Sequence, residues 1–190
     1  IPRPETEELV RWILEDNEKT EQALTILDMG TGSGCIPISI AKNLSNANVY
    51  GLDISLDALE VAQENNKIHC TQVVFFQADI LNLDYECTYD IIVSNPPYVR
   101  ELEKAEMQNN VINHEPSIAL FVPDEDPLKF YRAIVIFAAK HLNDKGSLYL
   151  EINQFLGKEM IALLKEYEFH TIKLKQDMYG NDRMLKGIIR

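Results

Sequence analysis

The chain has 190 residues, of which 46% are hydrophobic, and its 30 acidic and 18 basic side chains give a formal net charge of −12. This length and composition indicate one globular domain with a large core. The excess of acidic residues and the lack of any run of basic residues disfavour direct binding to nucleic acids. No stretch approaches the ~18 unbroken apolar residues of a membrane span and no signal peptide is visible, so we expect a cytoplasmic protein without a membrane partner.

The sulfur and imidazole side chains show no ligand pattern. Cys35, Cys70 and Cys87 are far apart and form no C-x-x-C pair, which is typical of free thiols in a reducing compartment. The four histidines have no metal-ligand spacing either, so we expect no metal.

Apolar periodicity predicts an alternation of strands and helices along the chain. Expected helices cover 5–14, the stretch that follows Gly34, the stretch that opens near Ser55, 128–142 and 156–167. Expected strands cover 24–29, 49–53, 73–76, 91–94, 148–152, 171–175 and 184–189. The last two strands have no helix between them, which suits an antiparallel hairpin. The pattern predicts an α/β fold with a doubly wound, mostly parallel, seven-stranded sheet that ends in this hairpin.

The second half of the chain contains a long connection, followed by a predicted helix start. Residues 99–126 form a long acidic connection with a helical piece expected at 101–107, and connections of this length are usually functional or disordered. Asp126 followed by Pro127 predicts a capped helix start at that point, with the proline in the first turn.

A glycine-rich loop, Gly30-Thr31-Gly32-Ser33-Gly34, joins the first strand to the following helix. Glycine has no Cβ and tolerates a positive φ, so a ligand can approach the backbone there, and the helix start favours a negatively charged ligand group. Cys35 stands where a dinucleotide fingerprint would have its third glycine. The spacing therefore suits a ligand with a carboxylate and a ribose better than one with a pyrophosphate.

Acidic residues end the next two strands. Asp53 stands where a carboxylate accepts hydrogen bonds from ribose hydroxyls, and Asp79 could receive an adenine amino group. An acid in such a position is, taken alone, more often a strand-end turn residue than a ligand-binding one. Three candidate sites at successive strand ends favour a shared ligand site.

The stretch Asn95-Pro96-Pro97-Tyr98 ends the apolar strand at 91–94. The two prolines fix φ, lack N–H donors and push the preceding residue towards extended geometry, which makes a stiff elbow. The amide of Asn95, the carbonyl of Pro96 and the ring of Tyr98 could together grip a flat, weakly basic nitrogen of an amide or a nucleobase amine. Taken alone, the four residues could also be a proline-rich turn.

Together these motifs resemble those of the S-adenosylmethionine-dependent class I methyltransferases, which have a Rossmann-like fold. Within this class, the motifs resemble those of the enzymes that methylate amino groups. The residues that carry this resemblance are Asp28-Met29-Gly30-Thr31-Gly32-Ser33-Gly34, Asp53-Ile54-Ser55 and Asn95-Pro96-Pro97-Tyr98. Three further segments resemble the glutamine N5-methyltransferases of peptide-chain release factors, namely Ile1-Pro2-Arg3-Pro4-Glu5-Thr6-Glu7, His114-Glu115-Pro116-Ser117-Ile118-Ala119-Leu120 and Gly180-Asn181-Asp182-Arg183.

This resemblance implies methyl transfer from S-adenosylmethionine, with S-adenosylhomocysteine as product, to a glutamine in the Gly-Gly-Gln loop of a release factor. The residues it assigns to the cofactor are Asp28, Gly30, Thr31, Gly32, Ser33, Gly34, Asp53, Ile54, Asp79, Ile80 and Asn95. It further implies that 1–190 is a methyltransferase domain, which we expect to be monomeric, without the small helical N-terminal domain usual in the family. The chain departs from the family pattern at Ile80, at His114 and over 122–126.

The elbow would then hold the substrate amide. Our hypothesis is that Asn95 Oδ1 and the Pro96 carbonyl accept hydrogen bonds from the two N–H groups of the target amide. Pro97 and Tyr98 would complete the substrate site, with Tyr98 packing on the planar amide. No strong general base is required. Arg3, Glu5 and Thr6 could line the substrate entrance or could simply be surface residues.

Two other functions are open on the sequence alone. The elbow would also serve a nucleobase amino methyltransferase acting on DNA or RNA, although the net charge of −12 counts against this. The other function is a non-catalytic scaffold of the same fold that binds a partner protein. The intact glycine loop, Asp53 and the elbow count against this scaffold function.

Overall fold

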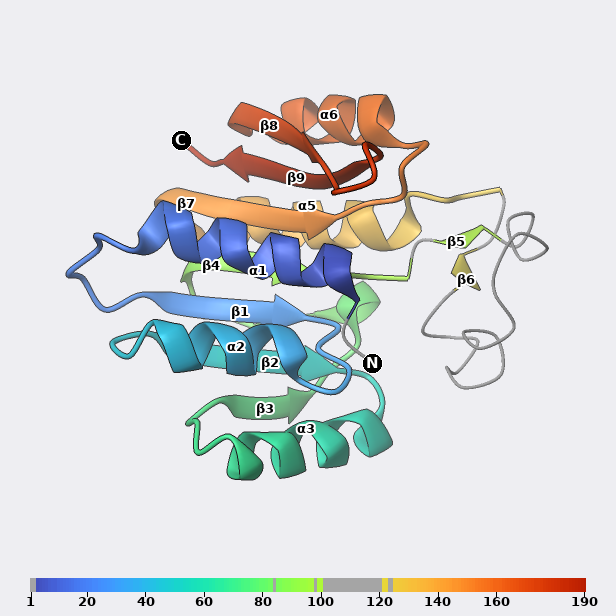
Figure 1. The fold of residues 1–190 in the computed structure, drawn as a ribbon. Coiled ribbons are helices and arrows are strands. Elements are labelled where there is room, and N and C mark those ends of the chain that lie inside the picture. The colour runs from blue at the N-terminus through green and yellow to red at the C-terminus, as the bar shows by residue number, and fades with distance from the viewer. Residues whose placement is uncertain (1–2, 84, 98, 101–120, 123–124) are drawn as a thin grey trace.

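The computed structural model describes residues 3–83, 85–97, 99–100, 121–122 and 125–190, shown as the coloured ribbon in Figure 1. The expected helical piece at 101–107 and the segment 114–120 lie outside the described residues.

Seven strands form one sheet in the order β3-β2-β1-β4-β7-β9-β8. Their bounds are β1 Thr25–Met29, β2 Asn48–Asp53, β3 Val74–Gln77, β4 Tyr89–Ser94, β7 Leu142–Glu151, β8 His170–Gln176 and β9 Asp182–Ile188. Strands β3, β2, β1, β4 and β7 pair in parallel, whereas β9 is antiparallel to both β7 and β8. The predicted doubly wound sheet with a C-terminal hairpin is confirmed. Two short strands inside the long connection, β5 Val99–Arg100 and β6 Phe121–Val122, pair with each other in a separate sheet.

Helices cover both faces of the large sheet (Figure 1). They are α1 Pro4–Asn17, α2 Cys35–Asn43, α3 Leu56–Ile68, the 3₁₀ turn η1 Ile80–Asn82, α5 Lys129–His141 and α6 Gly157–Glu166. In Figure 1, α1 and α2 lie in front of the sheet and α5 lies behind it.

The alternation of side chains along each strand divides the core into two layers. On β1, Ile26 packs with α1 and α2, whereas Leu27 and Met29 pack with α5 and α6. On β7, Tyr149 belongs to the α1 and α2 layer, and Leu150 belongs to the α5 and α6 layer. The same alternation assigns each polar residue at a strand end to one of the two faces.

Two predicted boundaries were wrong. Helix α5 begins at Lys129 rather than next to Asp126, because the Asp126 carboxylate pairs with the guanidinium of Arg132 at 3.0 Å instead of capping the helix, and Pro127 lies in a turn. Strand β7 begins at Leu142, six residues before the predicted start of the strand at 148.

The three cysteines are free thiols, as predicted. In the part of the chain that the structure describes, no helix is long and apolar enough to cross a membrane. The same residues include no group of three or more histidine, cysteine or acidic side chains that could hold a metal ion.

Candidate active site

The register of the parallel strands brings the candidate residues to one edge of the sheet. One row of paired residues crosses five strands and consists of Phe76, Leu52, Met29, Ser94 and Leu150. The residues that follow this row along the chain are Gln77, Asp53, Gly30, Asn95 and Glu151. The carboxyl ends of parallel strands are where open α/β sheets bind their ligands, so three predicted site residues and one unpredicted acid meet at that edge.

The glycine loop has the backbone conformation that its sequence predicts. Gly30, Gly32 and Gly34 have φ angles of 78°, 53° and 79°. Residues with a Cβ rarely adopt this backbone conformation. The N–H groups of Gly30 and Thr31 both donate to Leu52 O, at 2.9 and 2.8 Å, which fastens the loop to β2. The carbonyl of Ser33 accepts a hydrogen bond from Asn65 Nδ2 of α3 at 2.9 Å.

The glycines serve different purposes. A Cβ on Gly34 would lie 3.0 Å from both Ala62 Cβ and Phe75 Cζ, so this position permits the close packing of α2. A Cβ on Gly32 would meet no atom within 4 Å. The open side of the loop, where a ligand can approach the backbone, is therefore at Gly32.

The carboxylate of Asp53 supports the loop from the neighbouring strand. Its Oδ2 accepts the Gly32 N–H at 2.8 Å and its Oδ1 accepts the Ser55 N–H at 3.0 Å. Because each carboxylate oxygen has two acceptor sites, each still has one for a ligand hydroxyl. Asp53 thus orders the loop and can accept hydrogen bonds from a ribose at the same time.

Asp28 is a fully buried acid directly before the loop. Its Oδ2 accepts the Thr31 hydroxyl at 2.6 Å, whereas Oδ1 has no hydrogen-bond partner among the residues that the structure describes. Burial raises the pKa of Asp28 to about 7, the Thr31 hydrogen bond opposes this rise, and the charge of Asp53 adds to it. A buried acceptor without a partner calls for an explanation in a native structure, and a donor group on a bound ligand would supply one.

Apolar and acidic residues after β2 and β3 flank the loop. Ile54, which follows Asp53, is 50% exposed. Ile80 is half-buried beside the loop, with its Cδ1 3.5 Å from where a Cβ on Gly30 would lie. Asp79 caps η1, accepting the Leu81 N–H at 2.9 Å and the Asn82 amide at 2.7 Å. This is the turn role that the sequence left open for Asp79, and its adenine contact stays a prediction.

The elbow after β4 is held from two sides. Ser94 Oγ donates to Met29 O at 2.5 Å, which ties the end of β4 to the end of β1. Asn95 Nδ2 donates to Thr6 Oγ1 at 3.2 Å. Pro96 is buried and Pro97 is half-buried, while Tyr98 lies outside the described residues.

Two residues behind the elbow were not understood from the sequence. Thr6 was predicted to line the substrate entrance or to be a surface residue, but it is only 6% exposed and its hydroxyl donates to Glu151 Oε2 at 2.7 Å. Glu151, which the sequence analysis did not single out, is 0% exposed. An acid at the end of an apolar strand, the pattern that identified Asp53 and Asp79, would have indicated Glu151 as well.

The segment Gly180-Asn181-Asp182-Arg183 forms the turn into β9. Asp177 Oδ1 accepts the N–H groups of Tyr179 and Asn181 at 2.9 and 3.0 Å. Although burial would raise the pKa of Asp177, these hydrogen bonds and that from Arg183 lower it below its ordinary value. Arg183 also donates to Ile152 O at 3.2 Å, so the turn supports the chain just after Glu151.

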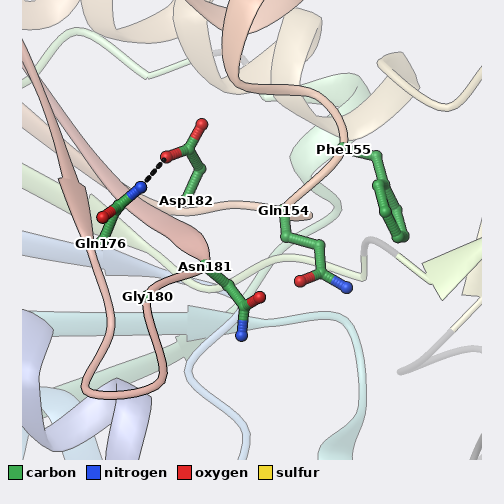
Figure 2. A pocket seen from close by; sticks show the side chains of 6 residues that line it. All are labelled: Gln154, Phe155, Gln176, Gly180, Asn181 and Asp182. Atoms are coloured by element: carbon green, nitrogen blue, oxygen red, sulfur yellow. Dashed lines mark hydrogen bonds between the residues drawn. The ribbon is translucent and has the colours of Figure 1, made fainter.

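A shallow pocket of about 250 Å³ lies beside this turn (Figure 2). It is lined by Gln154, Phe155, Gln176, Gly180, Asn181 and Asp182. Among the described residues of the glycine loop and the elbow, none lines this pocket. We therefore place the candidate active site at the strand ends and not in this pocket.

The sheet order, the glycine loop and the strand-end acids define a class I methyltransferase fold with a candidate ligand site at the carboxyl edge of the sheet. Comparisons with known proteins agree with this assignment. A family model described as "Methyltransferase domain" matches residues 20–189.

Two curated relatives named release factor glutamine methyltransferase align with nearly the whole chain. The protein from Flavobacterium psychrophilum is 54% identical over 98% of this chain and 66% of its own length. The protein from Lactococcus lactis subsp. lactis is 45% identical over 97% of this chain and 67% of its own length. The chain therefore belongs to the release factor glutamine methyltransferases within the methyltransferase domain family, and it spans about two thirds of the length of these relatives.

A solved structure shows the same fold. It is the protein-(glutamine-N5) methyltransferase (release factor-specific) of Alicyclobacillus acidocaldarius, with a TM-score of 0.62 and 24% identity over 100% of this chain and 94% of that chain.

Proposed function

We propose that this chain transfers the methyl group of S-adenosylmethionine to the side-chain nitrogen N5 of a glutamine in the Gly-Gly-Gln loop of a peptide-chain release factor. The observation that carries the proposal is the row of residues at the sheet edge. It sets Asn95 beside the glycine loop, because Ser94 and Met29 are register partners on neighbouring strands.

The residues present fit the cofactor. Asp53 offers one free acceptor site on each oxygen for the ribose hydroxyls, and Gly32 leaves space for close approach to the backbone. Ile54 and Ile80 offer apolar side chains for the adenine ring. Asp28 Oδ1, which is buried and has no hydrogen-bond partner among the described residues, suits the donor groups of the methionine moiety. When bound, S-adenosylmethionine supplies an electrophilic methyl group on a sulfonium.

The elbow would orient the attacking nitrogen. An amide nitrogen is a poor nucleophile because its lone pair is delocalised into the carbonyl. Its two N–H groups would donate hydrogen bonds to Asn95 Oδ1 and Pro96 O. These hydrogen bonds would aim the nitrogen at the methyl group and stabilise the positive charge that develops on the nitrogen. Tyr98 would pack on the flat face of the amide.

The nucleobase alternative uses the same elbow but needs a different surface. Transfer to a base in DNA or RNA requires attraction to phosphates, which a domain with a net charge of −12 opposes. The proposal is therefore a protein substrate that presents its glutamine on an exposed loop.

The test is transfer of labelled methyl from S-adenosylmethionine to a purified release factor. We expect label on the wild-type release factor and none on a variant in which the Gly-Gly-Gln glutamine is alanine. Duplex DNA and RNA should receive none. Equal labelling of the variant, or efficient transfer to adenine in DNA, would refute the proposed substrate.

A further inference from the structure

A chain of hydrogen bonds runs from the half-buried Asn95 into the core. Asn95 Nδ2 donates to Thr6 Oγ1 at 3.2 Å, and Thr6 Oγ1 donates to Glu151 Oε2 at 2.7 Å. The three residues come from the elbow, the first turn of α1 and the end of β7. Both Thr6 and Glu151 are buried.

The direction of these bonds determines which way the Asn95 amide faces. A threonine hydroxyl has one hydrogen, and Thr6 gives it to Glu151. Towards Asn95 the hydroxyl can then only accept, so the NH₂ group of Asn95 must face Thr6. The oxygen of the same amide is thereby turned away from Thr6 and left as the acceptor.

Thr6 is held in place by the rest of α1. At the other end of the helix, Asp16 accepts hydrogen bonds from Tyr149 Oη at 2.8 Å and from Lys186 Nζ at 2.7 Å. Between the two ends, Trp12 meets the edge of the Tyr149 ring with centroids 5.6 Å apart. The helix is therefore fastened to β7 at both ends, and Thr6 cannot move away from Glu151 without disturbing this packing.

The end of β7 is fixed as well. The hydroxyl of Tyr131, which is fully buried, accepts the Asn153 N–H at 3.1 Å and donates to Glu151 O at 3.4 Å. Glu151 thus has a rigid backbone and a buried side chain, which is the requirement for a group that orients another group by hydrogen bonding.

We propose that Thr6 and Glu151 are positioning residues that fix the polarity of the Asn95 amide, so that its oxygen and not its NH₂ group faces the substrate nitrogen. This inference rests on the proposed function for its catalytic consequence. Without the chain, a reversed Asn95 amide would present donors to the NH₂ group of the substrate and would repel it.

The central variant is Thr6→Val, which keeps the shape of the side chain and removes the hydroxyl. We expect kcat to fall about tenfold, within the range for coupled neighbours, while affinity for S-adenosylmethionine changes less than about twofold. Thr6→Ser should restore most of the rate. The matched control is Thr71→Val, because Thr71 also bonds an asparagine, Asn66, but lies before β3 at the opposite edge of the sheet.

A double variant separates positioning from a merely structural role. In the Asn95→Ala background there is no amide to orient, so Thr6→Val should cause no further loss of kcat. If Thr6 only fastened α1 to the sheet, Thr6→Val would lower kcat by the same factor in both backgrounds, and that result would overturn the inference.

A second readout does not depend on the methyl acceptor. In a ¹⁵N spectrum, the Asn95 side-chain NH₂ should exchange slowly with solvent in the wild type and in Thr6→Ser, and about tenfold or more faster in Thr6→Val, as expected on loss of a protecting bond. Equal exchange in wild type and Thr6→Val would overturn the inference. Absence of methyl transfer by the wild type to a release factor would refute only the proposed function.

Discussion

The two halves of the candidate site are built in different ways. On the side of β1 and β2, the glycine loop and Asp53 form a cradle from backbone N–H groups and a nearby carboxylate, with the Gly32–Asp53 bond spanning 21 residues. On the side of β4 and β7, Asn95 is oriented by Thr6 and Glu151 through bonds that span 89 and 145 residues. The first half is a motif that can be recognised locally, whereas the second exists only once α1 is packed on the sheet.

This difference separates the expected effects of mutation. Changes in the loop half should alter cofactor affinity or local packing, and changes in the elbow half should alter the rate of transfer. The following predictions test that separation, from the largest expected effect to the smallest.

Asn95→Ala should have the largest effect on catalysis. It removes one acceptor from the substrate amide and leaves Asp53 and the loop unchanged, so the transfer rate should fall ~100-fold or more, as when one preorganised catalytic group is lost. Cofactor affinity, measured by calorimetry, should change far less. A fall of rate and affinity by the same factor would instead make Asn95 a cofactor residue.

Gly34→Ala should destabilise the fold more than Gly32→Ala. Both positions have a positive φ, which costs about 1–2 kcal/mol with a Cβ. Only the Cβ at position 34 would also crowd Ala62 and Phe75, at 3.0 Å, which adds about 1–3 kcal/mol. Urea unfolding of both variants checks this order, and equal losses of stability would show that Gly34 has no special packing role.

Asp53→Ala should weaken binding of S-adenosylmethionine by ~1.5–3 kcal/mol, the range for hydrogen bonds to a charged group. The matched control is Asp57→Ala, because Asp57 is an exposed acid in the first turn of α3. Calorimetry on both variants, with folding checked by circular dichroism, measures the difference. Wild-type affinity in a folded Asp53→Ala protein would remove Asp53 from the cofactor site.

Asp28→Asn should change how stability depends on pH. The folded protein holds the Asp28 proton up to about pH 7, whereas the unfolded chain loses it near ~4. The folded state therefore binds more protons between these values, so Asp28 makes stability fall as pH rises through that window. The stability gained by Asp28→Asn over the wild type should grow from about pH 4 to 7 and stay constant above. A pH-independent difference in denaturant unfolding would contradict the raised pKa.

Most of the fold followed from the sequence because buried strands appear as short apolar runs and helices as periodic ones. The alternation of strands and helices predicted the mostly parallel sheet, and the absence of a helix between the last two strands predicted the hairpin of β8 and β9. The glycine loop, Asp53 and Asn95 were also identified, because each lies at or directly after the end of a strand.

The sequence did not reveal the polar residues whose partners are distant. Glu151 is the last residue of strand β7, and only the packed α1 shows that its carboxylate contacts Thr6. The helix start at Asp126 was mispredicted for a related reason, since its carboxylate finds Arg132 and does not cap the backbone. Local chemistry predicts which groups can bond, but the tertiary structure selects among the possible partners.

The most direct test of the account is to locate the methyl group on the product. After incubation of a release factor with S-adenosylmethionine and either the wild type or Asn95→Ala, mass spectrometry of the proteolysed release factor shows which residue is modified. The account predicts one added methyl group on the glutamine of the Gly-Gly-Gln peptide with the wild type, and a strongly reduced yield with Asn95→Ala. An unmodified glutamine, or a methyl group on another residue, would contradict it.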